Sequence, residues 1–155
     1  ETWQAFEKAL EGGKIRGIGV SNFNPHHLDE LLAKTNIVPA LNQVELHPAL
    51  QQAEVRRYNS EHGIATEAWS PLGRGRFGEN PVLVEIARRH GKSVAQVIIR
   101  WHIELGNLVI PKTSNPERLK ENIDVFDFAL SPEDMASIAT LNTGERVGPN
   151  PDDLG

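Results

Sequence analysis

The sequence contains no cysteine, which excludes disulfide bonds, thiolate metal sites and cysteine nucleophiles. No apolar run approaches the roughly 20 residues that a membrane-spanning helix needs, and no signal-peptide pattern opens the chain. Basic residues are outnumbered, with 16 Lys and Arg against 21 Asp and Glu and a net charge of −5. Proteins that bind nucleic acids or anionic membranes generally carry a basic surplus. We therefore expect a cytoplasmic protein with neither kind of partner.

Several catalytic signatures are also missing. The six histidines do not show a zinc-binding spacing, and no Ser-His-Asp signature, Walker A motif or Rossmann glycine fingerprint is present. His26 and His27 are neighbours in the sequence, so we expect their rings to point in different directions. The sequence thus predicts no metal site.

Of the 155 residues, 39% are hydrophobic and 24% are charged, as in ordinary globular domains. Short apolar runs alternate with stretches of helical periodicity, which is typical of βαβ units and a parallel sheet. Strands are predicted at residues 15–20, 40–46, 64–69 and 108–111. Helices are predicted from Thr2, at residues 25–34, 51–62, 81–90 and 93–105, and from Asn115 and Ser131, followed by a loop-like tail from Thr143.

The number of predicted units indicates part of a larger architecture. An eight-stranded (β/α)8 TIM barrel typically needs ~250 residues, so four β/α units amount to about half of one. Glu1 opens the sequence inside a helical pattern, with Thr2 as the expected N-cap, and the single methionine is Met135. We therefore expect residues 1–155 to be one half of a barrel domain whose other strands lie upstream. The alternative is a small open doubly wound domain.

Polar residues gather where the predicted strands end. They are Ser21 and Asn22 at the first strand, Asn42, Gln43, Glu45 and His47 at the second, Trp69 and Ser70 at the third, and Lys112, Thr113 and Ser114 at the fourth. In β/α barrels the active site is built at this edge of the sheet. Serine and asparagine at strand ends can instead cap the following helices. Amides inside a strand, such as Asn42 and Gln43, need hydrogen-bond partners from a ligand or from the backbone.

The segment after the fourth strand has the composition of an anion site. Asn115 is a suitable N-cap and Pro116 suits the first helical position, and the N-terminus of a helix favours an anion. Together with two neighbouring hydroxyls, Lys112 and Arg118 predict a phosphate site held by charge-assisted hydrogen bonds. The alternative is that both are surface cations and that Glu117 pairs with one of them.

Trp69 and the glycine-rich loop of residues 70–76 are less specific signals. A tryptophan at a strand end more often packs in the core, but beside a polar cluster it can also be a stacking platform for a flat ring. The loop could wrap a pyrophosphate with its backbone amides, although any turn uses glycine.

Four segments together resemble the aldo-keto reductase family. Residues 17–23 (GIGVSNF), 42–48 (NQVELHP), 68–73 (AWSPLG) and 110–122 (IPKTSNPERLKEN) are similar to family motifs, occur in the family's order and cover nearly the whole chain. The tail at residues 148–152 resembles the short carboxyl terminus of bacterial members similar to diketogluconate reductases. The resemblance implies a TIM barrel to which this chain contributes strands 5–8.

The resemblance also implies a cofactor, NADPH, and a role for each motif. Ser21, Asn22 and Gln43 would bind the nicotinamide carboxamide, Trp69 would stack on its ring, Ser70, Leu72 and Gly73 would line the pyrophosphate, Lys112, Thr113, Ser114 and Arg118 would hold the 2′-phosphate, and Glu121 and Asn122 would contact the adenine. Trp69 stands where many members carry Tyr, and Thr113 stands where Ser is usual.

The family's catalytic Asp, Tyr, Lys and His lie on the first four strands, so the resemblance places no catalytic residue in this chain. Tyr58, His47 and Lys112 do not take those roles. We expect the intact protein, a monomer, to reduce a small aldehyde or ketone with NADPH, and this chain alone to be inactive without its other half. The alternatives are a non-catalytic NADPH-binding regulatory or structural protein of the same fold, and an unrelated phosphate-binding barrel.

Overall fold

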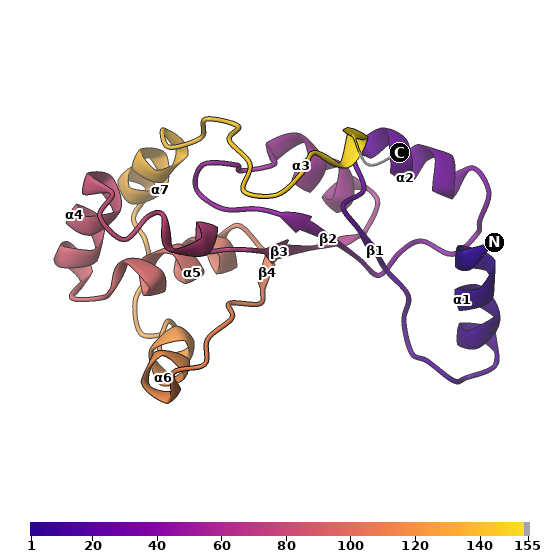
Figure 1. The fold of residues 1–155 in the computed structure, drawn as a ribbon, viewed down its shortest axis with the longest axis horizontal. Helices are drawn as coiled ribbons and strands as arrows, with labels where there is room; N and C mark the ends of the chain where they lie inside the picture. The colour runs from indigo at the N-terminus through magenta and orange to yellow at the C-terminus, as the bar shows by residue number, and fades with distance from the viewer. Residues whose placement is uncertain (154–155) are drawn as a thin grey trace.

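The computed structural model describes residues 1–153, and its centre is one sheet of four parallel strands in the order β1-β2-β3-β4 (Figure 1). The strands are β1 Val20–Ser21, β2 Leu41–Glu45, β3 Ala65–Trp69 and β4 Leu108–Val109. The helices are α1 Thr2–Glu11, α2 Pro25–Leu32, α3 Ala53–Glu61, α4 Pro81–His90, α5 Val94–Glu104, α6 Pro116–Ile123 and α7 Pro132–Ala139, and two 3-10 turns, η1 Gly73–Gly75 and η2 Pro151–Asp153, lie in the loops. Strand and helix alternate, so the predicted parallel α/β fold is confirmed.

The register of the sheet decides which side chains meet. Gln43 of β2 lies opposite Ser21 of β1 and Glu67 of β3, and Glu45 lies opposite Trp69. Side chains alternate between the two faces of a strand, and the exposure of β2 and β3 follows this alternation over most of their length. One face therefore packs into the core, while Gln43 and Glu67 stand together on the other.

The hydrophobic core lies between the buried face of the sheet and the helices that follow β2 and β3. Val44 and Ala68 from the sheet belong to one buried cluster with Ile86 of α4 and with Ile98 and Trp101 of α5. Each buried aliphatic or aromatic side chain stabilises the fold by about 1.5–3 kcal/mol relative to leaving it exposed. This packing fixes β2 and β3, which carry Asn42, Gln43, Glu67 and Trp69 of the site described below.

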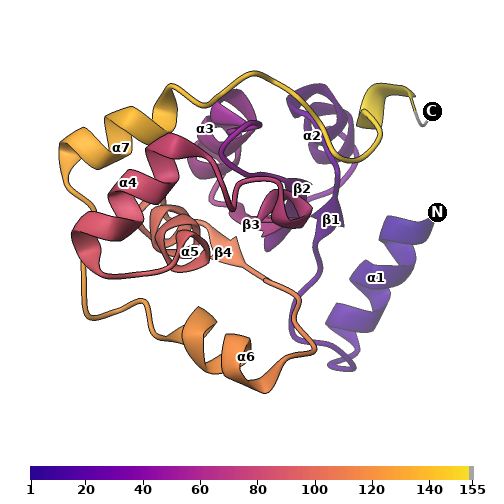
Figure 2. The same cartoon turned by 60° about the vertical axis from the view of Figure 1, so that its left-hand side comes forward.

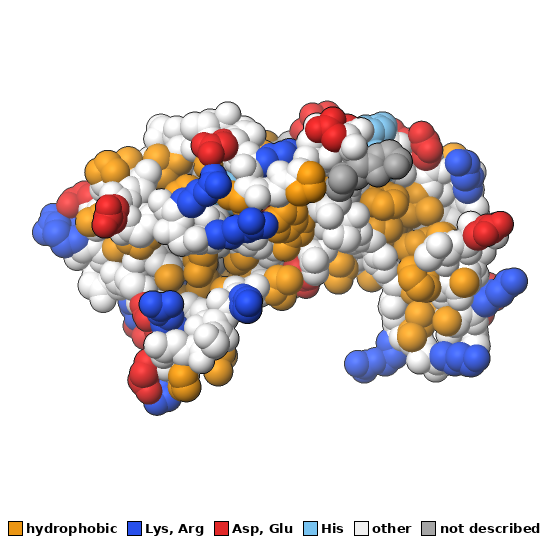
Figure 3. Space-filling view, in the orientation of Figure 1, with side chains coloured by type: hydrophobic (Ala, Val, Ile, Leu, Met, Phe, Trp, Pro, Cys, Tyr) orange, Lys and Arg blue, Asp and Glu red, His pale blue; other side chains and the backbone are white. Residues whose placement is uncertain are grey.

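The two ends of the sheet are much less covered. α1 and α6 contribute no buried residue, and Figures 1 and 2 show them beside opposite edges of the sheet. In Figure 3 a broad hollow separates these two ends, with hydrophobic side chains along it. Large apolar side chains are exposed in both regions, including Phe6 of α1 and Leu119 and Ile123 of α6.

The predicted edge strands are longer than the observed ones. In place of residues 15–20 the structure has only Val20–Ser21. Within residues 1–153 β1 pairs with β2 alone, and the backbone before it keeps a single bond to that side, from the Ala40 amide to the Ile18 carbonyl at 2.7 Å. In place of residues 108–111 it has Leu108–Val109, and Pro111 has no N–H with which to extend the ladder. Thr2 is also not the N-cap of α1; that position belongs to Glu1.

Most other predicted helix starts are confirmed, but the helix predicted from residue 51 begins at Ala53, with Gln52 as its N-cap. Ser131 and Asp134 form the expected reciprocal capping box of α7, with Ser131 Oγ accepting from the Asp134 amide at 3.1 Å. Within residues 1–153 no helix combines the length and the apolar character needed to cross a bilayer.

Candidate functional site

Because the strands are parallel, their carboxyl ends meet at one edge of the sheet, and the polar residues gather there. Asn22, Ser70 and Arg74 at this edge have positive φ angles of 60°, 49° and 57°. Only glycine adopts this region readily, and asparagine tolerates it better than serine or arginine. Strained non-glycine backbone clusters at functional sites more than elsewhere, so the loops after β1 and β3 are candidates for a binding surface.

Trp69 determines how the Asn22 amide is oriented. The indole Nε1–H donates to Asn22 Oδ1 at 2.7 Å. An indole nitrogen is a donor only, so the amide oxygen must face it and the amide NH2 group must point elsewhere. Among residues 1–153 that NH2 group has no acceptor. Asn22 therefore presents a hydrogen-bond donor at the edge.

Glu67 fixes the Gln43 amide in the complementary sense. Gln43 Nε2 donates to Glu67 Oε1 at 2.5 Å. A carboxylate only accepts hydrogen bonds, so the amide nitrogen faces Glu67 and the amide oxygen is turned away as an acceptor. The Asn22 backbone amide donates to the Gln43 carbonyl at 2.9 Å, which keeps the two residues adjacent. A donor from Asn22 beside an acceptor from Gln43 matches the two ends of a primary carboxamide.

Ser21 and Asn42 have different surroundings. The Ser21 hydroxyl donates to the Gln43 carbonyl at 3.0 Å, which leaves its oxygen lone pairs as acceptors at the exposed edge. Asn42 is buried and exchanges two hydrogen bonds with the backbone of Phe23, at 3.3 Å and 2.8 Å. Of the two partners predicted for the Asn42 amide, ligand or backbone, the structure shows the backbone. Asn42 thus ties the loop after β1 to β2.

The residues predicted to hold phosphates line two neighbouring cavities. One, of about 570 Å³, is lined by Leu72, Gly75, Gly78, Ser93, Val94, Ala95, Lys112, Thr113, Ser114, Arg118, Glu121 and Asn122. The other, of about 560 Å³, is lined by Ser70, Pro71, Leu72, Arg74, Gly75, Ile110, Pro111, Lys112 and Arg118. Lys112 and Arg118 line both cavities, so the two cations face a common space. Arg74, which was not predicted from the sequence as a site residue, lines the second cavity as well.

The start of α6 differs from the expectation in one respect. Asn115 is the N-cap as predicted, and its Oδ1 accepts from the amides of Glu117 at 2.9 Å and Arg118 at 3.4 Å. These amides are therefore already engaged, and the helix would attract an anion mainly through its dipole. Glu117 pairs with Lys120 at 3.2 Å. The alternative that Glu117 neutralises Lys112 or Arg118 is wrong.

The loop after β3 is supported from below. Gly73 is buried, and a Cβ added to it would lie 2.3 Å from the Phe77 ring. The absence of a side chain at Gly73 therefore allows the loop backbone to pack closely against that ring. His102 of α5, fully buried, lies 3.4 Å from the Pro71 carbonyl through Nε2 and 3.4 Å from the Asn107 side chain through Nδ1. Burial lowers the pKa of His102 to about 3, so the ring is neutral and can donate to Pro71.

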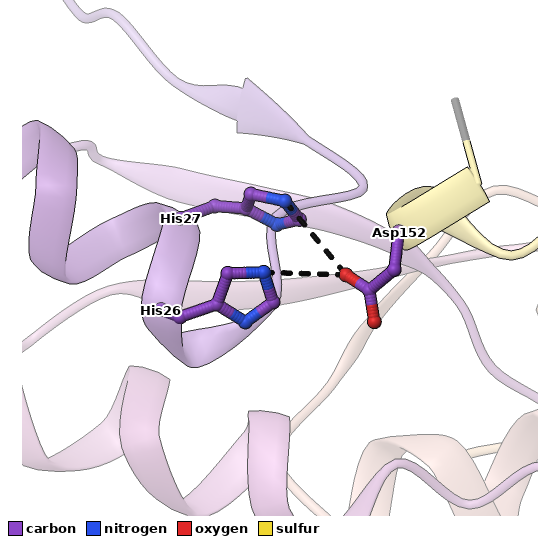
Figure 4. A group of neighbouring side chains, drawn as sticks. All are labelled: His26, His27 and Asp152. Atoms are coloured by element: carbon purple, nitrogen blue, oxygen red, sulfur yellow. Dashed lines mark ion pairs between the residues drawn. The ribbon is translucent and has the colours of Figure 1, made fainter. Parts of the chain in front are cut away.

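The histidine pair lies on α2, next to the carboxy-terminal tail. His26 and His27 do not point in different directions as expected: both rings face Asp152, with Nε2 atoms 3.3 Å and 3.7 Å from its Oδ1 (Figure 4). Neighbouring residues of a helix are separated by about 100° rather than 180°, so both can reach one point beside the first turn. Asn24 Nδ2 also donates to this oxygen at 2.7 Å.

The side chains of His26, His27 and Asp152 have potential ligand atoms within 4.8 Å of one another, which is close enough for a metal site. However, His27 Nδ1 accepts the Asn24 amide at 3.0 Å. A neutral His27 ring then carries its proton on Nε2, the atom that a metal would need. The hydrogen bonds fit a clip that holds the tail, not a metal centre.

A further cavity, of about 380 Å³, lies at the opposite end of the strands and includes Arg56, Arg57 and Asn107 in its lining. Arg56 donates through Nε to the Gln51 carbonyl at 2.9 Å, and burial lowers its pKa. This cavity could take a small anion, but no complementary amide pair accompanies it. It therefore offers fewer groups for recognising a ligand than the edge that carries Asn22 and Gln43.

Comparison with known proteins gives one consistent family. The sequence model of the Aldo/keto reductase family matches residues 1–143. A glyoxal reductase from Bacillus subtilis is 56% identical over 154 residues, which are 99% of this chain and 56% of that protein. A morphine 6-dehydrogenase from Pseudomonas putida is 48% identical over 167 residues, with 99% and 56% covered.

Solved structures agree with the sequence comparison. A variant of Gox0644 in complex with NADPH is 44% identical with a TM-score of 0.95, over 98% of this chain and 56% of that one. An aldo-keto reductase of Bombyx mori in complex with NADP is 37% identical with a TM-score of 0.89, over 98% and 53%. The chain thus spans about half the length of the relatives it matches.

Proposed function

Because the chain belongs to the aldo/keto reductase family, we propose that the whole protein reduces a small aldehyde or ketone with NADPH, and that this chain binds most of the cofactor. The observation that carries the proposal is the single edge at which an oriented amide pair, Asn22 and Gln43, accompanies cavities that contain Lys112 and Arg118. A primary carboxamide and phosphates are the groups that such an edge fits.

At one end of the site the nicotinamide carboxamide is recognised. The Asn22 NH2 group donates to the carboxamide oxygen, and the Gln43 oxygen accepts from the carboxamide nitrogen, with Ser21 as a further acceptor. The half-buried Trp69 ring, held by Asn22, is the stacking platform. The bound dihydronicotinamide supplies a hydride for a carbonyl carbon. Holding the ring in one pose is what the protein contributes to that transfer.

At the other end the phosphates and adenine are bound. Lys112 and Arg118, with the hydroxyls of Thr113 and Ser114, hold the 2′-phosphate, and Glu121 and Asn122 line the same cavity toward the adenine. Ser70 and Leu72 line the adjoining cavity and face the pyrophosphate, while Gly73 shapes their loop. Two cations without carboxylate partners within residues 1–153 suit a doubly charged phosphate.

We also propose that the four strands form half of an eight-stranded barrel, as strands 5–8 of one domain. Within residues 1–153 both edge strands of the sheet are short and have no further strand beside them, and exposed apolar residues flank them. An open parallel sheet of this kind is normally covered. The remaining strands would carry the general acid that donates a proton to the developing alkoxide, so this chain alone is predicted to reduce nothing.

A fluorescence titration of the full-length protein with NADPH tests the binding site. Tryptophan emission should be quenched with saturation, and Trp69→Phe should remove most of the quenching, since Trp3 lies on α1 bonded to Thr35 and Trp101 lies in the core. Trp101 is fully buried in the core and serves as an internal reference. No saturable effect of NADPH would sink the proposal. Binding without reduction of any carbonyl tested would instead indicate a non-catalytic NADPH-binding protein.

A further inference from the structure

The tail of residues 143–153 follows α7 and passes along the site to the side of α2 (Figures 1 and 2). The amides of Thr143 and Gly144 donate to the Ala49 carbonyl at 3.0 Å and 2.9 Å. At its far end Asp152 is held by the Asn24 and histidine clip described above. Between these two anchors the tail makes its most buried attachment, to Glu45.

Glu45 at the end of β2 is 1% exposed, and its carboxylate receives the tail backbone. Oε1 accepts from the Val147 amide at 2.5 Å, and Oε2 accepts from the Gly148 amide at 3.1 Å. His47 Nε2 lies 3.0 Å from Oε1, and burial lowers the pKa of His47, so a neutral ring donates there. A buried carboxylate needs such donors, and two of the three come from residues 147 and 148.

The attachment presses the tail against Trp69. A Cβ built on Gly148 would lie 2.5 Å from Trp69 Cη2 and 3.2 Å from Glu45 Oε2. No side chain fits there, so glycine at this position is required for the close approach of the backbone to the indole. The other end of the same indole donates to Asn22. A continuous set of contacts therefore runs from Glu45 through Gly148 and Trp69 to Asn22.

We propose that Glu45 is a positioning residue for the nicotinamide end of the cofactor site. By holding residues 147–148 against the indole, it keeps Trp69 where it can bond Asn22, and thereby keeps the Asn22 NH2 group directed at the carboxamide. This inference rests on the proposed NADPH site. It adds that the ring platform is set by a carboxylate and a tail segment that do not touch the cofactor themselves.

The competing explanation is that Glu45 and His47 only stabilise the fold. Binding of two different ligands distinguishes this explanation from the positioning role. NADPH uses the whole site, whereas adenosine 2′,5′-bisphosphate has the 2′-phosphate and adenine but no nicotinamide. A general loss of stability weakens the binding of both ligands. A loss of Trp69 positioning weakens the binding of NADPH alone.

The test compares three variants of the full-length protein by titration with both ligands. Glu45→Gln replaces one accepting oxygen with an NH2 group, and Gly148→Ala keeps the carboxylate but adds the clashing Cβ. Glu145→Gln is the matched control, because Glu145 lies in the same tail but makes only an exposed ion pair with Arg76. Circular dichroism checks the fold, and Gly148→Ala keeps the test decisive if Glu45→Gln does not fold.

Glu45→Gln and Gly148→Ala should each raise the Kd for NADPH about tenfold, as for loss of one charged hydrogen bond. The Kd for the bisphosphate should stay within about twofold. In the double variant the Kd for NADPH should rise by less than the product of the two single-variant increases, because both substitutions act on one contact. Glu145→Gln should change neither ligand.

Equal losses for both ligands, or unchanged NADPH binding in both variants, would overturn the role of Glu45. Failure of the unsubstituted protein to bind NADPH would instead refute the proposed function, so the two failures are distinguishable.

Discussion

Replacing Arg118 with methionine should remove the protein's preference for a cofactor with a 2′-phosphate. The side chain lines both cavities at the phosphate end and has no acidic partner within residues 1–153, because the nearby Glu117 pairs with Lys120. Its charge is therefore available to a phosphate without breaking an existing ion pair. Methionine is shorter but keeps much of the apolar stem, and it removes every donor.

The size of the effect follows from this geometry. A hydrogen bond to a charged group contributes about 1.5–3 kcal/mol. Arg118 is exposed, so solvent screens it and the lower part of that range applies. Arg118→Met should raise the Kd for NADPH about 10- to 30-fold, which corresponds to roughly 1.4–2 kcal/mol. NADH lacks the 2′-phosphate, and its Kd should stay within about twofold.

Fluorescence or calorimetric titration of the full-length protein at constant ionic strength measures both constants. Arg88→Met is the matched control: it makes the same substitution on the exposed side of α4, where Arg88 pairs with Glu85 and lines neither cavity. Its effect should be within about twofold, as for most surface substitutions. Equal weakening of NADPH and NADH by Arg118→Met, or an equal effect of Arg88→Met, would show that Arg118 does not read the 2′-phosphate.

Three further predictions concern the amide pair and two buried groups. Glu67→Leu should free the Gln43 amide to rotate and weaken NADPH and NADH alike by about 1 kcal/mol, the usual net worth of a hydrogen bond, in the same titrations. Because burial lowers the pKa of His102 from 6.5 to about 3, only the unfolded chain gains this proton below pH 6.5. The free energy of unfolding should thus fall by up to about 1.4 kcal/mol per pH unit toward pH 3, and denaturant titrations should show a shallower fall for His102→Gln. Burial of Asp134 raises its pKa, but hydrogen bonds from His90, Ser131 and Arg89 outweigh this and lower it to about 2. Asp134→Asn should cost about 2 kcal/mol at pH 7 in urea unfolding, and the difference should vanish as pH falls from about 4 to 2; a constant difference would contradict the assignment.

The sequence predicted best what is local. Lys112, Asn115 and Arg118 lie within seven residues of one another, and the helix signal at Asn115–Pro116 places the two cations by itself. Their shared cavities follow from that short segment. The central strands were also predictable, because β2 and β3 are paired and buried and their apolar pattern reflects this.

What the sequence could not predict depends on distant segments. The bond from Gln43 to Glu67 requires the register of two strands, and the contact of Gly148 with Trp69 joins residues far apart in the chain. The predicted lengths of the two edge strands were too great, because a strand with a single neighbour extends only over the residues that pair with that neighbour. The orientation of His26 and His27 depends on Asp152, which the tail brings to α2.

The most direct measurement is a crystal structure of the full-length protein with NADPH bound. The 2′-phosphate should lie between Lys112 and Arg118, and the carboxamide should meet Asn22 Nδ2 and Gln43 Oε1 with the ring on Trp69. A cofactor whose 2′-phosphate lies elsewhere, for example in the cavity lined by Arg56 and Arg57, would contradict the account.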